Sequence, residues 1–169
     1  MVGLGPGLGA ASAGGAVAMP LTCSLSAPAR VPAGQPLRLQ FSVVNLGPQA
    51  VDLLVWGTPF DADWFAPYVD VLSVDAARGD TRLRYRGASM KRGEPAADEY
   101  LHFDAGQART VSVDLARAFD LGTPGRYRVQ PRIVLHDLVV GGEAALPRPR
   151  ERHAGMVLPC QPVDIEITR

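Results

Sequence analysis

The chain has 169 residues, of which 47% are hydrophobic and 20% charged, a composition typical of one globular domain with its own core. Its 17 basic and 17 acidic residues give a formal net charge of +0. This balance argues against a nucleic-acid-binding protein, which usually carries a basic excess, and against a disordered chain. A run of about 18 strongly apolar residues is missing, so we expect no membrane-spanning helix.

The first 19 residues are rich in Gly and Ala and have neither charge nor periodicity. Ala16-Val17-Ala18 fits the small-residue pattern of a signal-peptide cleavage site, but the basic start of a signal peptide is missing. We interpret residues 1–19 as a disordered leader, either a signal remnant or a segment added by cloning, with an authentic export signal as the alternative. Residues 20–169 are assigned to a single domain.

Apolar and polar residues alternate along most of this domain, which is typical of half-buried strands. The pattern begins at residues 21–26 and is cleanest at residues 37–43. The later strand-like segments are 51–56, 68–74, 82–86, 99–103, 111–115, 127–135 and 163–168. Polar, breaker-rich loops occupy 87–98 and 141–155, and residues 116–122 favour at most one helical turn. About eight short strands predict an all-β fold, an antiparallel immunoglobulin-like β-sandwich, with a small closed barrel as the alternative.

Cys23 and Cys160 are the two cysteines, one near each end of the predicted domain. If the terminal strands are neighbours, the thiols can form a disulfide, which would stabilise the fold by about 4–5 kcal/mol through loop entropy. Two buried free thiols are the alternative. The absence of a C-x-x-C motif and of a nearby histidine argues against a zinc site.

The motifs of common enzyme classes are missing from the sequence. His102, His136 and His153 lie far apart, and none belongs to an H-E-x-x-H motif; a P-loop and a G-x-S-x-G motif are also missing. Asp61 and Asp63 form only a fragment of a calcium-binding loop. We therefore expect a protein that is not an enzyme and has no cofactor or bound metal.

Two surface features leave alternatives open. Trp64 and Phe65 lie in an acidic loop, where they either anchor a partner or pack beneath the loop. Arginines alternate along residues 82–86 and 126–132. They either form a surface for an acidic partner or, as we favour, alternate with acids on neighbouring strands to give a solvated face.

A set of motifs in a fixed order resembles a known family. The motifs are Asn45-x-Gly47, Trp56-Gly57-Thr58-Pro59, Tyr85-x-Gly87-x-x-x-Lys91-Arg92-x-x-Pro95-x-x-x-x-Tyr100, Asp104-x-Gly106, Val113-Asp114-Leu115 and Phe119-Asp120-x-x-x-x-Gly125-x-Tyr127-x-Val129. Together they resemble the N-terminal prodomain of deuterolysin-like (aspzincin) zinc metallopeptidases, including the branch specific for lysine. The resemblance covers residues 21–135.

The chain reaches Arg169 without the H-E-x-x-H motif of that family's catalytic domain. The resemblance therefore implies a stand-alone relative of the prodomain or an excised prodomain, and we favour the stand-alone domain. Such prodomains assist the folding of their protease and cover its active-site cleft. The implied function is that of a secreted or periplasmic bacterial domain that inhibits or chaperones a deuterolysin-like zinc protease. An immunoglobulin-like surface binding or adhesion module with an unknown ligand is the alternative.

The resemblance directs attention to the loop 87–98. The candidate partner-binding residues are Lys91, Arg92, Glu94, Asp98, Trp64 and Phe65. Lys91 is the only lysine in the chain and fits the acidic subsite that a lysine-specific protease must have. Glu94 or Asp98 is a candidate carboxylate for the zinc ion of such a partner. The alternative, which we favour, is that Lys91 and Arg92 hold the loop by pairing with Asp98 or Glu99.

Overall fold

The computed structural model of the chain describes residues 18–62, 64, 66–142 and 144–169. Phe65 and residues 1–17 of the expected leader lie outside the described residues. Short strands and single turns of 3-10 helix make up the described part. In chain order these are β1 (Leu21–Ser26), β2 (Arg30–Pro32), β3 (Arg38–Asn45), β4 (Val51–Leu54), β5 (Val69–Val74), β6 (Thr81–Arg82), η1 (Ala97–Glu99), β7 (Tyr100–Phe103), β8 (Ala108–Asp114), η2 (Leu115–Arg117), β9 (Gly125–Pro131), β10 (Ile133–Leu135), β11 (Leu138–Val140), η3 (Arg150–Arg152), β12 (Met156–Leu158) and β13 (Val163–Thr168).

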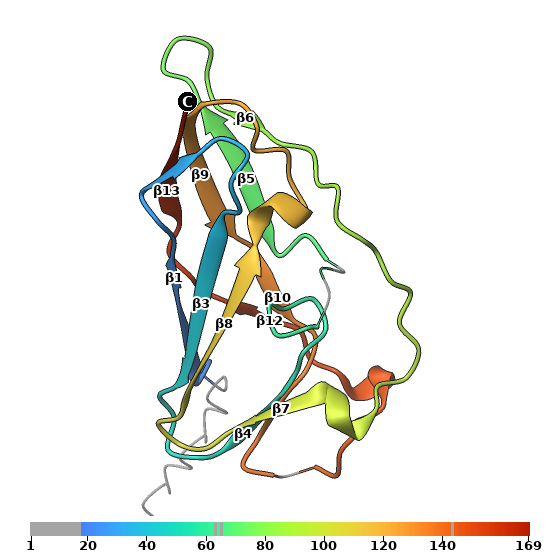
Figure 1. Ribbon diagram of the computed structural model, residues 1–169. Helices are drawn as coiled ribbons and strands as arrows, with labels where there is room; N and C mark the ends of the chain where they lie inside the picture. Colours follow the sequence, from blue (N-terminus) through green and yellow to red (C-terminus); the bar gives the residue numbers. More distant parts are fainter. Residues whose placement is uncertain (1–17, 63, 65, 143) are drawn as a thin grey trace, which may run out of the picture.

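Most of these strands form the two layers of a β-sandwich, while β10 and β12 pair antiparallel as a separate two-stranded sheet (Figure 1). In one layer β3 lies between β1 and β8, and both pairs are antiparallel. The sheet β11-β4-β7 continues this layer, because β4 follows β3 and β7 precedes β8. The second layer has the order β2-β13-β9-β5-β6, in which β2 runs parallel to β13 and the other pairs are antiparallel. The predicted all-β, antiparallel sandwich is confirmed.

Alternating burial along β3 shows which face of this strand packs into the core. Leu39, Phe41 and Val43 are buried, while the residues between them are partly or fully exposed. Val71 and Val129 of the second layer belong to the same core. Burial of each such side chain contributes about 1.5–3 kcal/mol to the free energy of unfolding. Period-two alternation therefore indicates both that the segment is a strand and which of its faces is buried.

Two further contacts close the sandwich. The Tyr127 hydroxyl, near the start of β9, donates to the Thr123 carbonyl at 2.7 Å, which is the tyrosine corner of immunoglobulin-like domains. Cys23 in β1 forms a disulfide with Cys160, 137 residues later, and their Cα atoms lie 4.9 Å apart. The expected pairing of the two cysteines is therefore present, and it joins the two ends of the domain.

Some segments differ from the sequence-based expectation. The predicted strand 82–86 is wrong beyond Arg82, because the chain leaves the sheet after the Leu83 amide donates to β5. The predicted strand 127–135 is split at Arg132, whose amide donates to the end of the loop before β5. The strands β2 and β11 were not expected, since three residues are too few for a period-two pattern to be visible.

Candidate partner-binding site

A long segment without regular sheet pairing connects the two layers. We call residues 83–99 the strap; it begins after β6 and ends with η1, directly before β7. In Figure 1 it runs along the outer side of the domain, beside the stacked sheets. The strap includes the whole of the loop 87–98 that the sequence singled out.

Tyr85 fixes the first half of the strap. Its hydroxyl donates toward the carbonyl oxygens of Ala88, at 2.7 Å, and Trp64, at 3.0 Å. Its ring lies edge-on to that of Phe119, with centroids 5.9 Å apart. Gly87 permits this arrangement, because a Cβ at that position would overlap the Tyr85 ring. The glycine of the motif therefore has a packing role.

Arg92 fixes the second half of the strap. Its guanidinium forms ion pairs with Asp61 and, at 3.5 Å, with Glu99, and it lies 5.2 Å from the ring centroid of Trp56. The indole of Trp56 in turn donates to the Glu99 carboxylate at 2.8 Å. Only 19% of the Arg92 side chain is exposed, so its guanidinium group is engaged mainly by contacts inside the domain. The favoured alternative is confirmed for Arg92, which pairs with Glu99. It is wrong for Lys91, which forms no ion pair with a described residue.

The two carboxylates around Arg92 differ in their electrostatics. Burial raises the pKa of Asp61 in spite of the neighbouring Arg92 charge. The pKa of Glu99 is lowered, because its carboxylate accepts hydrogen bonds from the Ala96 amide and the Trp56 indole. The pair of Arg92 and Asp61 is largely buried, so removal of either partner would leave the other charge uncompensated.

An exposed stretch lies between the two anchors. Ser89, Met90 and Lys91 are exposed and form no hydrogen bond or ion pair with the rest of the described chain. The side chain of Met90 is 48% exposed. An apolar side chain beside a positive charge, on a segment tethered at both ends, is suited to contact with another protein.

A buried cluster supports the end of the strap. Asp137 is fully buried and accepts hydrogen bonds from the guanidinium of Arg148 and, at 2.9 Å, from the hydroxyl of Tyr100. The His153 Nε2 atom lies 3.9 Å from the same carboxylate. Burial alone would raise the pKa of Asp137, but the hydrogen bonds from Arg148 and Tyr100 lower it overall. Burial and the neighbouring carboxylate raise the pKa of Tyr100 to about 12. The cluster attaches the loop 141–155 to β7.

The same loop contacts the strap directly. The Arg150 amide donates to the Glu94 carboxylate at 3.0 Å, and its guanidinium donates to the Arg92 carbonyl at 2.8 Å. Glu94 is therefore bonded to the fold, whereas Asp98 is exposed in η1. Contact of either carboxylate with a partner's zinc ion stays a prediction.

Trp64 does not lie on the surface. It is 4% exposed and stacks on Tyr68, with ring centroids 4.6 Å apart, while Phe119 meets it edge-on. The hypothesis that Trp64 anchors a partner is wrong, and the alternative of packing beneath the loop holds. Phe65, the second aromatic of that hypothesis, lies outside the described residues.

Sequence reasoning missed Asp137 and Arg148. One signal was available, because Ile133, Leu135 and Asp137 continue a single period-two pattern and all three are buried. An acid at an inward position requires a basic or hydrogen-bonding partner. The pattern does not say which residue this partner is, since Arg148 lies in a loop without periodicity.

Several arginines of the second layer pair with neighbouring acids. Arg82 and Arg132 share Asp70, at 2.5 and 3.2 Å, and Arg128 pairs with Asp164 at 2.8 Å. For these residues the favoured interpretation of interleaved charges is confirmed. This face is therefore a weak candidate for an acidic partner.

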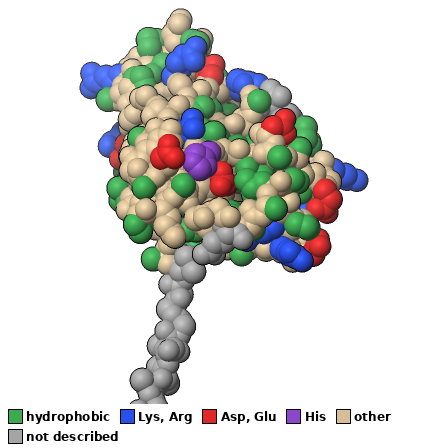
Figure 2. Space-filling model, turned by 90° about the horizontal axis from the view of Figure 1, so that it is seen from below, with side chains coloured by type: hydrophobic (Ala, Val, Ile, Leu, Met, Phe, Trp, Pro, Cys, Tyr) green, Lys and Arg blue, Asp and Glu red, His purple; other side chains and the backbone are tan. Residues whose placement is uncertain are grey.

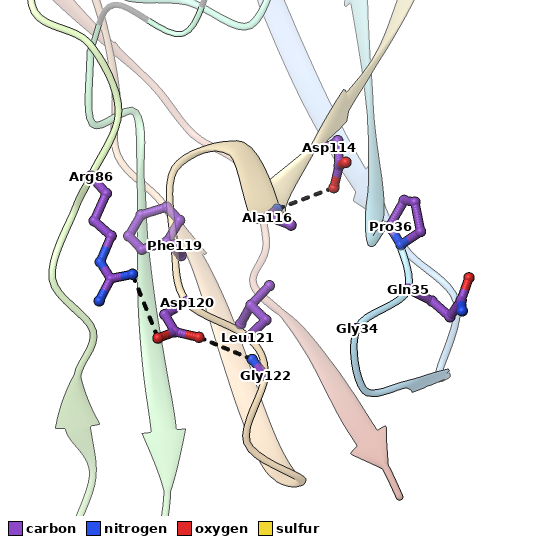
Figure 3. A pocket seen from close by; sticks show the side chains of 10 residues that line it. All are labelled: Gly34, Gln35, Pro36, Arg86, Asp114, Ala116, Phe119, Asp120, Leu121 and Gly122. Carbon is purple, nitrogen blue, oxygen red and sulfur yellow. Dashed lines mark hydrogen bonds and ion pairs between the residues drawn. The ribbon is translucent and has the colours of Figure 1, made fainter.

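A hollow of about 420 Å³ lies near the start of the strap, between the turn before β3 and the segment after η2 (Figure 3). At its rim Arg86 faces Asp120 at 3.5 Å, and Asp120 also accepts a hydrogen bond from the Gly122 amide. Asp114 accepts from two backbone amides and caps η2. The charged side chains at this hollow are thus paired within the domain, and the pair of Arg86 and Asp120 attaches the strap to the segment after η2.

Histidine and acidic side chains gather on the face of the domain that Figure 2 shows from below. In β7, His102 contacts two carboxylates: Nδ1 lies 2.9 Å from Asp52 and Nε2 lies 3.1 Å from Asp104. Hydrogen bonds to these carboxylates raise the pKa of His102. The contacts join β4 to β7 and its following turn.

No group of three or more His, Cys, Asp or Glu side chains suited to a metal ion occurs among the described residues. None of the described helices is long and apolar enough to cross a membrane.

The sequence matches no protein-family model and no curated protein. Among solved structures, the chain is similar to a β-glucosidase from Listeria innocua (12% identity, TM-score 0.35), covering 87% of this chain and 16% of that one. It is also similar to an alkylpurine DNA glycosylase from Pseudomonas fluorescens (14% identity, TM-score 0.33), covering 89% of this chain and 31% of that one. A third similar structure is a CARDB domain from Pyrococcus furiosus (12% identity, TM-score 0.29), where the match covers 83% of this chain and 87% of that one. The chain thus spans a small part of the first two proteins. At these identities and TM-scores we base no functional conclusion on them.

Proposed function

We propose that this chain is a non-enzymatic, secreted or periplasmic domain that inhibits or chaperones a deuterolysin-like zinc metallopeptidase by covering its active-site cleft with the strap. Lys91 enters the cleft, where an acidic subsite of a lysine-specific peptidase receives its ammonium group. The resemblance of the sequence to prodomains of that family supports the partner, and the Cys23–Cys160 disulfide suits an oxidising compartment.

One observation carries this proposal: most motif residues in and next to the strap contact the rest of the domain, whereas Lys91 does not. Those with buried positions or contacts inside the domain are Tyr85, Gly87, Arg92, Pro95 and Tyr100. Lys91 differs from all of them, because its side chain is exposed and has no partner among the residues described. A motif residue that the fold does not use is available to a partner.

The arrangement around Lys91 favours association. Because the strap is held on both sides of the exposed stretch, it loses less conformational entropy on binding than a free loop would. An ammonium group opposite a carboxylate in a desolvated subsite gains a charge-assisted hydrogen bond. Met90 adds apolar area beside this charge.

Titration of a purified deuterolysin-like peptidase with the domain tests the proposal, and thermolysin serves as the control enzyme. We expect saturable inhibition of the deuterolysin-like peptidase and none of thermolysin. A domain that is folded by circular dichroism and inhibits neither enzyme would contradict the proposal. The immunoglobulin-like surface binding or adhesion module would then be the function to test.

A further inference from the structure

We infer that the strap is a proteolytic cleavage site whose product stays in place: a peptide bond flanking Lys91 is open to hydrolysis, and the cut domain keeps its fold. Cleavage and the retained fold stand independently of the proposed function. Retained inhibition by the cut domain rests on that function.

Residues 89–91 meet the requirements of a peptidase substrate. A peptidase binds an extended chain through its backbone groups, so the segment must be exposed and unpaired. These residues are exposed, lie outside the strands and helices, and form no hydrogen bond with any described part of the domain. On hydrolysis the C–N bond breaks, the hydroxyl of water goes to the carbonyl carbon, and its proton goes to the nitrogen. The products are a carboxylate and an ammonium group.

Both new chain ends remain attached to the domain. Upstream of the cut, the Ala88 carbonyl accepts from Tyr85, and the Arg86 amide donates to the Ala118 carbonyl at 2.7 Å. Downstream, Arg92 keeps its side-chain ion pairs, and its carbonyl accepts from the guanidinium of Arg150. After the cut, only the few residues between these contacts become free to move, and they stay covalently attached to their own part of the chain.

The two parts of the chain are joined throughout the fold. The pairs β3–β8, β4–β7, β5–β9 and β2–β13 each combine a strand before Lys91 with one after it. The disulfide between Cys23 and Cys160 also crosses the cut covalently. The product is thus a two-chain domain with the same core. Such a product stays in a peptidase cleft, because its two new ends cannot leave separately.

The composition of the chain allows a clean experiment. Because Lys91 is the only lysine, an endopeptidase that cuts after lysine has a single site. We expect it to cut the native domain once, giving one band on a non-reducing gel and two on a reducing gel, with an unchanged near-ultraviolet circular dichroism spectrum. Lys91→Arg is the matched control; it keeps the charge, removes the site and stays intact. A native domain that resists this enzyme, or a cut domain that loses its near-ultraviolet signal, would overturn the inference.

The purified cut domain is then titrated against the deuterolysin-like peptidase. Equal inhibition by the cut and intact domains supports retention of the product. Inhibition by the intact domain alone overturns it. Inhibition by neither form rejects the proposed function and retained binding with it, whereas the gel and the spectrum decide cleavage and the retained fold by themselves.

Discussion

The first half of the strap depends on the missing side chain of Gly87. The Tyr85 ring occupies the space where a Cβ would lie, packs against Phe119, and directs its hydroxyl to Ala88. A substitution at this one position therefore acts on the presentation of Lys91 without touching it.

Gly87→Ala is expected to displace the Tyr85 ring, to lower the free energy of unfolding by about 1–3 kcal/mol and to weaken inhibition. Urea unfolding followed by fluorescence measures the first effect, and the peptidase assay measures the second. Gly93→Ala is the matched control, since a Cβ at Gly93 meets open space. Equal effects of the two substitutions would contradict the role given to Gly87.

Asp137 is a fully buried carboxylate that holds Arg148. Asp137→Asn is expected to lower the free energy of unfolding by about 3–5 kcal/mol, because the guanidinium loses its charged partner in a buried site. Asp164→Asn is the control, since it breaks the exposed pair with Arg128 and should have little effect. Urea unfolding at neutral pH compares the two variants.

The same carboxylate makes stability depend on pH in the acid range. Its pKa is lower in the folded chain than in the unfolded chain, so the unfolded chain takes up the proton first as the pH falls. The contribution of Asp137 is complete above the ordinary Asp pKa of about 3.9 and is lost as the pH falls through the folded value. The difference in stability between the wild type and Asp137→Asn should therefore shrink on acidification. A difference that is constant with pH would show that the charge of Asp137 is not what stabilises the fold.

The strap and the strands differ in how easily they open. Residues 89–91 have no backbone hydrogen bonds to described residues, whereas β3 and β9 are paired on both sides. We expect the amides of residues 89–91 to exchange with solvent without measurable protection, and those of β3 and β9 to exchange only through global unfolding. Hydrogen exchange followed by NMR measures both. Protection of residues 89–91 at the level of β3 would mean that this stretch is closed.

The sequence predicted the strands that bury one face in the sandwich, because their period-two pattern reports that burial directly. Residues 82–86 also alternate, yet they leave the sheet after Arg82. A strand needs a neighbour as well as a pattern, and β6 has only β5 beside it, at the edge of the layer. The presence of a neighbour is decided by the whole fold and cannot be read from five residues.

The candidate site was predictable only in part. Lys91 stands out in the sequence as a unique charge in a polar loop, and it is exposed. The anchoring of Arg92 depends on Asp61, which lies 31 residues away in sequence. Trp64 resembles an exposed anchor in sequence, because the rings that bury it come from other segments. Contacts between distant segments are what the sequence pattern left undetermined.

The domain as a unit has the properties of a scaffold that presents one short segment. Two layers of strands share the main core, a disulfide joins the ends of the domain, and the strap is fixed on both sides of residues 89–91. Rigid support of this kind lowers the entropic cost of binding. The proposed function therefore depends on the fold for support and on Lys91 for recognition.

The most direct test compares inhibition of the deuterolysin-like peptidase by the wild type, Lys91→Gln and Arg78→Gln. Arg78 is the matched control, because it is an exposed cation in the turn between β5 and β6 and its loss changes the net charge equally. We expect Lys91→Gln to raise the inhibition constant by at least about tenfold, or about 1.4 kcal/mol, and Arg78→Gln to leave it unchanged. Inhibition by Lys91→Gln as strong as that by the wild type would show that Lys91 does not enter the cleft.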